Sequence, residues 1–129
     1  MKKTKQMVGS SFYDETILAT ASELIEILGE PEYGRGDVDD KVQYDWEMET
    51  DDGVYFTIYD WKEYHKFGED AVIRWHIGGM DRVSTKKGRA ELFKELNKEY
   101  ERILLQSLRN RRILIRTYKL QGLLVKRKY

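Results

Sequence analysis

Hydrophobic and polar residues alternate most regularly between Val42 and Trp61. Apolar side chains occupy every second position up to Met48, and a second alternating run follows the turn sequence Asp51-Asp52-Gly53. Alternation with a period of two is typical of strands that bury one face. The segment therefore predicts a β-hairpin with strands near residues 42–49 and 54–61.

The length of the turn decides which side chains share a face of this hairpin. A two-residue turn would place Glu47 opposite Ile58, whereas a three-residue loop with Gly53 in the left-handed position pairs Trp46 with Ile58. Because a shift of one residue moves every side chain to the other face, we expect the three-residue loop. The expected core face comprises Val42, Tyr44, Trp46, Met48, Val54, Phe56 and Ile58. The opposite face comprises Asp45, Glu47, Glu49, Tyr55, Thr57, Tyr59 and Trp61.

Two further strands and two helices are expected around this hairpin. Residues 11–19 and 71–77 have the β-branched and aromatic content of strands, and the second would add Arg74 and His76 to the acidic face, where they could offset its charge. Thr20 and Glu23 form a capping box before a short apolar run that ends at Gly29. Apolar residues then recur at helical spacing over residues 86–109, with Ser84 or Thr85 as the expected cap.

The two ends of the chain are less regular. Residues 1–10 are expected to form a flexible tail. Residues 110–129 fit either a basic hairpin that turns at Gly122 or a basic amphipathic helix, and their β-branched content favours the hairpin. The apolar surface of the long helix and of this end exceeds what one small sheet covers, so a homodimer or higher oligomer is expected through it.

Together these elements predict an α+β fold, with an antiparallel sheet and one short and one long helix. The length of 129 residues fits a single domain, with residues 100–129 as a basic carboxyl-terminal extension. Cysteine is absent, which excludes disulfides and cysteine-based zinc sites and favours a cytoplasmic protein. No apolar run is long enough to span a bilayer, and no apolar segment follows the basic start, so we expect neither a membrane anchor nor a secretory signal.

Charge is segregated along the chain although the net charge is zero. Residues 13–70 carry 18 acids and 4 bases, and residues 101–129 carry 9 bases and one acid. Such asymmetry can indicate a nucleic-acid-binding end, for which the candidates are Arg109, Arg111, Arg112, Arg116 and Arg127. The two regions can also neutralise each other, within one chain or between subunits, and zero net charge favours this interpretation.

Catalytic signatures are absent from the sequence. The two histidines, His65 and His76, have no metal-binding spacing, and no nucleophile elbow, phosphate-binding loop or dinucleotide fingerprint occurs. The paired acids of the hairpin lie evenly along one strand, which suits a surface better than a glycosidase cleft. We therefore expect a protein that is not an enzyme and that has no cofactor or metal.

The acidic and aromatic face of the hairpin is the best candidate site. Tyrosine and tryptophan are enriched at protein interfaces, and interleaved acids would select a basic partner. Alternatively, the long helix covers this face and the sheet is a buried layer. The candidate protein-binding residues are Asp45, Glu47, Glu49, Tyr55, Tyr59 and Trp61.

Residues 11–79 resemble a group of small, uncharacterised phage proteins. The resemblance is carried by Ala19-Thr20 with Glu23-Leu24, Leu28-Gly29-Glu30-Pro31, Lys41-Val42 with Trp46, Asp52-Gly53, Thr57-Ile58-Tyr59-Asp60-Trp61-Lys62 and Trp75-His76-Ile77-Gly78-Gly79. It implies a phage accessory protein in the bacterial host cytoplasm and carries no catalytic residues with it. We expect a binding protein that inhibits a host defence system, such as CRISPR, by acting on a host protein or ribonucleoprotein complex; the alternative is a nucleic-acid-binding protein.

Overall fold

The computed structural model describes residues 1–6, 9–32, 42–63 and 67–120 of the chain. It divides into two compact units, Met1–Leu96 and Asn97–Tyr129, which are described separately. All strands of the described residues and the first helix belong to the first unit, and the second helix begins there. The described part of the second unit is helical throughout.

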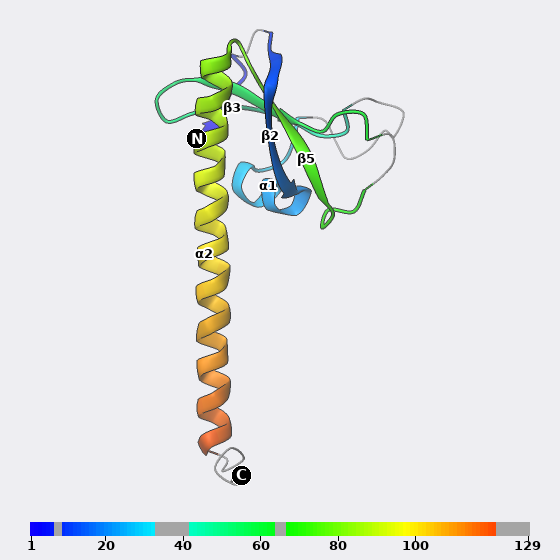
Figure 1. The fold of residues 1–129 in the computed structure, drawn as a ribbon. Helices are drawn as coiled ribbons and strands as arrows, with labels where there is room; N and C mark the ends of the chain where they lie inside the picture. Colours follow the sequence, from blue (N-terminus) through cyan, green and yellow to red (C-terminus); the bar gives the residue numbers. More distant parts are fainter. Residues whose placement is uncertain (7–8, 33–41, 64–66, 121–129) are drawn as a thin grey trace. The chain divides into compact units, whose positions relative to one another are not determined.

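The first unit is built on a five-stranded antiparallel sheet with the order β1-β3-β4-β5-β2 (Figure 1). The strands are β1 (Lys2–Lys3), β2 (Ser11–Thr20), β3 (Asp45–Glu49), β4 (Tyr55–Tyr59) and β5 (Val72–Gly79). The helices are α1 (Ala21–Leu28) and α2 (Arg82–Leu120). The predicted α+β class, with one short and one long helix, is confirmed.

The predicted register of the hairpin is confirmed. Trp46 lies opposite Ile58 and Met48 opposite Phe56 in the β3–β4 pair. The three-residue loop is present, with Gly53 at φ 85°, where a residue with a Cβ atom would be strained. Both strands are shorter than predicted: β3 begins at Asp45 and β4 ends at Tyr59, so Val42 and Trp61 lie outside them.

Both helices pack on one face of the sheet. Trp46, Phe56 and Ile58 form a single buried cluster with Leu24 of α1 and Leu92 of α2. The backbone of α2 lies close to the sheet at Gly88. A Cβ atom added at this position would lie only 2.4 Å from the ring of Phe56. Glycine at this position therefore lets the helix backbone rest on the aromatic ring. The alternative in which the long helix covers the acidic face is wrong for the first unit.

Two tryptophans form the centre of this cluster. The indole rings of Trp46 and Trp75 meet edge to face, with 5.5 Å between their centroids. Each buried indole N–H donates to a backbone carbonyl, from Trp46 to Gly29 at 2.8 Å and from Trp75 to Ala19 at 2.9 Å. The polar atom of each large aromatic side chain is thus satisfied inside the core.

The capping box that opens α1 is confirmed. The Glu23 N–H donates to the Thr20 hydroxyl, and the Thr20 N–H donates to the Glu23 carboxylate at 2.8 Å. Gly29 ends the helix at φ 84° and donates its N–H to the carbonyl of Ile25. Capping at both ends explains how a helix of this length is held in place.

The long helix differs from its prediction at both ends. Asp81 caps it in place of Ser84 or Thr85, because its carboxylate accepts from the Ser84 N–H at 2.7 Å. At the other end α2 continues to Leu120, so the predicted hairpin over residues 110–129 is wrong for residues 110–120. Extending an existing helix costs far less than nucleating a new element, and this outweighs the strand preference of Ile113 and its neighbours. Residues 121–129 lie outside the described residues.

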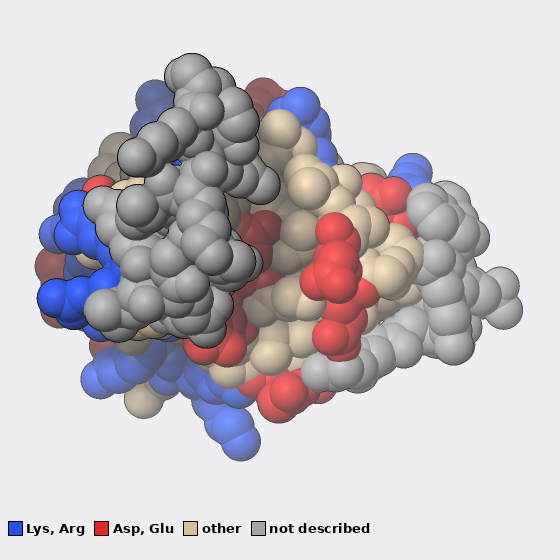
Figure 2. All heavy atoms as spheres, turned by 90° about the horizontal axis from the view of Figure 1, so that it is seen from below, with Lys and Arg blue, Asp and Glu red and all other residues tan. Residues whose placement is uncertain are grey.

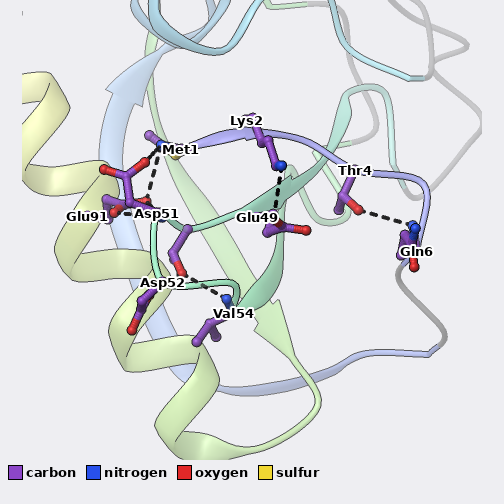
Figure 3. Close-up of polar contacts among 10 residues, drawn as sticks. Met1, Lys2, Thr4, Gln6, Glu49, Asp51, Asp52, Val54 and Glu91 are labelled. Carbon is purple, nitrogen blue, oxygen red and sulfur yellow. Dashed lines mark hydrogen bonds and ion pairs between the residues drawn. The ribbon is translucent and has the colours of Figure 1, made fainter.

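The first residues of the chain are part of the sheet. Lys2–Lys3 form β1, the edge strand that pairs with β3, whereas the sequence predicted a flexible tail over residues 1–10. The α-amino group of Met1 contacts the carboxylates of Asp51 in the hairpin loop and Glu91 on α2 (Figure 3). Charge pairing and two residues of strand thus join this segment to two other elements.

Replacement of Trp46 by alanine tests the packing of the core. The indole is 1% exposed, so Trp46→Ala removes its burial and leaves a cavity that should lower the free energy of unfolding by about 3–5 kcal/mol. Trp61→Ala is the matched control, because Trp61 is 41% exposed and should cost less than about 1 kcal/mol. Urea titration followed by circular dichroism measures both. Equal costs for the two variants would contradict the assignment of faces.

Candidate functional site

No helix of the described residues covers the opposite face of the sheet in the first unit. We call this surface the helix-free face; its members are Asp45, Glu47, Glu49, Tyr55, Thr57, Tyr59, Arg74 and His76. The antiparallel register brings them together, because Asp45 lies opposite Tyr59, which in turn lies opposite His76. Residues from three strands therefore share one surface although they are far apart in the sequence.

The three acids of β3 have different surroundings. Lys2 of β1 places its ammonium 3.4 Å from Glu49 and neutralises it. Asp45 accepts a hydrogen bond from the Thr57 hydroxyl at 2.7 Å. Neither Asp45 nor Glu47 has a lysine or arginine within ion-pair distance among the described residues. The acidic face is thus neutralised at one end of β3 and left negative at the other.

The two remaining acids are held in an unfavourable environment. Burial raises the pKa of Asp45 above its ordinary value; the hydrogen bond from Thr57 opposes this rise, and the charge of Glu32 adds to it. Burial also raises the pKa of Glu47, and the charges of Asp45 and Glu32 raise it further. Three carboxylates therefore repel one another at this point, and a cation placed between them would relieve the repulsion.

A hollow of about 250 Å³ lies between these groups. It is lined by Gly9, Ser10, Val42, Asp45, Glu47, Thr57 and Tyr59. Val42, predicted on the core face, therefore lines the helix-free side. Gly9 and Ser10 belong to the chain that leads from the β1 edge of the sheet to β2 at the other edge. Sequence reasoning missed them, because they lie outside the alternating pattern.

An aromatic cluster continues the surface from Tyr59. The ring of Tyr59 lies 5.6 Å from His76 and 6.3 Å from Trp61, and His76 also faces Phe12 at 4.3 Å. Trp61 and Phe12 are both exposed. Amphipathic rings beside acids are typical of the central residues of protein interfaces.

The predicted neutralisation of the acids by Arg74 and His76 is not found. Arg74 donates to the Thr16 hydroxyl at 3.0 Å and lies opposite Leu18 on β2, away from β3. Burial lowers the pKa of His76 below its ordinary value, so its ring is mainly neutral at pH 7. Sequence alternation placed both side chains on the correct face but gave no information about their distance from Asp45 along the strands.

Asp60 supports the hollow from the core side of the chain. Its carboxylate is fully buried and accepts the backbone N–H groups of Gln43 and Tyr44 at 2.8 and 2.7 Å. These bonds hold the segment that enters β3 at the end of β4. Burial raises the pKa of Asp60, and the two backbone donors oppose the rise. The sequence offers one signal for this role: Asp60 is an acid that directly follows the alternating pattern of β4.

The predicted basic site lies on a different element. Arg109, Arg111, Arg112 and Arg116 are exposed residues of α2 in the second unit, and Arg127 lies outside the described residues. Seen from below the view of Figure 1, acidic atoms form a ridge through mainly uncharged surface (Figure 2). Among the described residues, no three acid or histidine side chains lie close enough together to hold a metal ion.

The opposite environments of Glu47 and Glu49 predict opposite effects on stability. Glu47→Gln should raise the free energy of unfolding at pH 7 by about 0.2–1 kcal/mol, because it removes repulsion, and Glu49→Gln should lower it because it removes the pair with Lys2. The pKa of Glu47 is raised on folding, so the folded protein is penalised at a pH where Glu47 is ionised, and the penalty falls as the pH is lowered. The gain from Glu47→Gln should therefore shrink as the pH falls towards 4, because Glu47 takes up a proton and loses the charge that is repelled. Thermal unfolding between pH 4 and 8 measures this; a loss of stability for Glu47→Gln at pH 7 would contradict it.

Comparison with known proteins gives no match: no family model, no curated protein and no solved structure matches the chain. In the described part of α2 and in α1, no stretch has the length and apolar character needed to cross a membrane. A functional assignment therefore rests on the geometry of the chain itself.

Proposed function

We propose that this chain is a non-enzymatic binding protein whose helix-free face captures a basic surface of a bacterial host protein or ribonucleoprotein complex, and that it inhibits a host defence system by doing so. The observation that carries the proposal is a pair of acids, Asp45 and Glu47, that have no cationic partner among the described residues and lie beside exposed aromatic rings. Such a pair lowers the stability of the isolated protein. A partner that supplies a cation would recover this energy on binding.

The shape of the surface supports a protein partner. The hollow between Asp45 and Tyr59 is of a size that accepts one long side chain, and its rim continues into Trp61 and Phe12. Arginine fits both parts, because its guanidinium pairs with carboxylates and stacks on aromatic rings. Glu49, which Lys2 already neutralises, contributes less to this recognition than the other two acids.

The choice of a host defence system as the target rests on the resemblance of residues 11–79 to small phage proteins. Small phage proteins commonly act as antagonists of host defence, and this warrant is one of association. A location in the bacterial cytoplasm follows from the same resemblance, and the lack of cysteine agrees with it. The acidic surface adds a physical reason, because proteins that handle nucleic acids present basic surfaces.

The direct test measures phage infection of bacteria that carry one defined defence system each, with and without this protein. Expression of the chain should raise plating efficiency on at least one defended strain. Asp45→Asn with Glu47→Gln should abolish the effect, because the pair keeps its shape and loses its charge. Glu26→Gln is the matched control, since Glu26 is an exposed acid on α1, and it should act like the unchanged protein.

Affinity capture from the protected strain then identifies the mode of action. Capture of a component of the defence system should survive nuclease treatment and should be lost with the Asp45 and Glu47 variant. No rise in plating on any strain, or equal activity of the charge-free and control variants, would contradict the proposal.

A second candidate, binding to nucleic acid, is favoured by one specific observation. Because residues 102–120 are helical, Arg102, Arg109, Arg112 and Arg116 recur at positions that share one side of α2. This arrangement presents a basic stripe to a phosphate backbone. Arg111 lies on the opposite side of α2 from these four arginines, although it was predicted as a member of the same site.

Salt dependence tests this candidate. Arg109→Glu with Arg116→Glu should weaken binding to labelled DNA or RNA at low salt and should flatten the dependence of affinity on salt by about 0.9 per lost contact. Lys86→Glu is the control, because it changes the charge of an exposed residue of α2 outside the stripe. Fluorescence anisotropy with single- and double-stranded probes measures the affinity. Equal binding by all variants would exclude a role for the stripe.

A further inference from the structure

The part of α2 in the second unit has two chemically different sides. Successive residues of an α-helix are rotated by about 100°, so Tyr100, Ile103, Leu104 and Leu108 share one side, which we call the leucine side. The basic stripe lies on the other side. Leu104 is 60% exposed and Leu108 is 41% exposed. Large apolar residues that recur along one side of an exposed helix usually mark an interface.

Two charged residues mark the leucine side. Arg111 lies on it, one turn beyond Leu108, and Glu101 lies at its border, just before Leu104. Ten residues, or about 15 Å of helix, separate these two charges. Neither has an ion-pair partner among the described residues, whereas their neighbours Glu99 and Arg102 pair with each other at 2.6 Å. The spacing prevents Glu101 and Arg111 of one copy from meeting.

We propose that a second copy of this chain covers the leucine side, and that the two α2 helices run antiparallel and cross near Gln106. In that arrangement Leu104 of each copy faces Leu108 of the other. Glu101 of each copy then meets Arg111 of the other, and the two-fold axis makes this ion pair twice. This arrangement buries two exposed leucines of each chain and pairs two charges that have no ion-pair partner among the described residues.

Charge complementarity selects the antiparallel orientation. In a parallel pair, Arg111 would face Arg111 and Glu101 would face Glu101, and like charges at such positions repel. Nucleic acid would engage the basic stripe and leave Leu104 and Leu108 in water, so it does not account for this side. The inference concerns a surface separate from the helix-free face and does not rest on the function proposed above.

Two neighbouring leucines provide a matched test of the surface. Leu104 and Leu105 are 60% and 62% exposed, but Leu105 lies among the arginines of the basic stripe. Leu104→Asp should weaken the dimer at least tenfold, and Leu105→Asp should change its dissociation constant less than threefold. Sedimentation velocity on the full chain from low to high micromolar concentration measures both. Near-ultraviolet circular dichroism, which reports the packed tryptophans of the first unit, verifies folding.

Charge reversal tests the orientation. Glu101→Arg and Arg111→Glu should each weaken the dimer about tenfold, and the double variant should return to within about threefold of the unchanged protein, because the pair is rebuilt with reversed sign. A monomer at high micromolar concentration would overturn the proposal. Equal effects of Leu104→Asp and Leu105→Asp, or a double variant no better than the single variants, would overturn it as well.

Discussion

The edge-to-face contact between Trp46 and Trp75 is the interaction on which the rest of this molecule depends. It joins two strands, and each indole N–H bonds to a carbonyl at an end of α1, from Trp46 to Gly29 and from Trp75 to Ala19 just before the helix. An indole of this size buries a large apolar area where helices cover its face of the sheet. Because side chains alternate along a strand, Asp45 and Glu47 lie on the face opposite Trp46. Gly88 has no side chain, so α2 packs on the apolar face without a clash.

The cost of this arrangement appears on the helix-free face. Asp45 and Glu47 lie in surroundings that disfavour their charge, with Glu32 nearby, while Lys2 relieves only Glu49. A sequence shaped for stability alone would place a basic residue or an uncharged one here, because removing a like-charge repulsion is an easy route to a more stable protein. Acids that oppose folding and lie beside exposed rings are the basis of the binding function that we propose.

Much of this fold could be predicted from local patterns. The alternation around Trp46, the glycine of the hairpin loop and the capping box of α1 are signals within a few residues of one another, and the structure confirms all three. The features that were not predicted depend on residues far apart in the sequence. Lys2 of β1 pairs with Glu49 of β3, and Gly9 and Ser10 line the hollow together with residues of β3 and β4. Residues 110–120 of α2 were predicted to belong to a hairpin, because their β-branched content was given more weight than the extension of the preceding helix. The acids of the candidate site were identified from the sequence, but their charge state was not, because it depends on which cations the fold brings near.

The central claim is that one face of the sheet is covered by helices and the other presents acids to a partner. The most direct measurement is the rate at which a thiol reagent modifies single cysteines placed at Glu47 and at Met48, in a chain that otherwise has none. Neighbouring strand positions point to opposite faces, and Met48 is 2% exposed. The account predicts rapid modification at position 47 and protection at position 48 until the protein unfolds. Comparable protection at both positions would show that the acidic face is covered in the free protein, and would contradict the account.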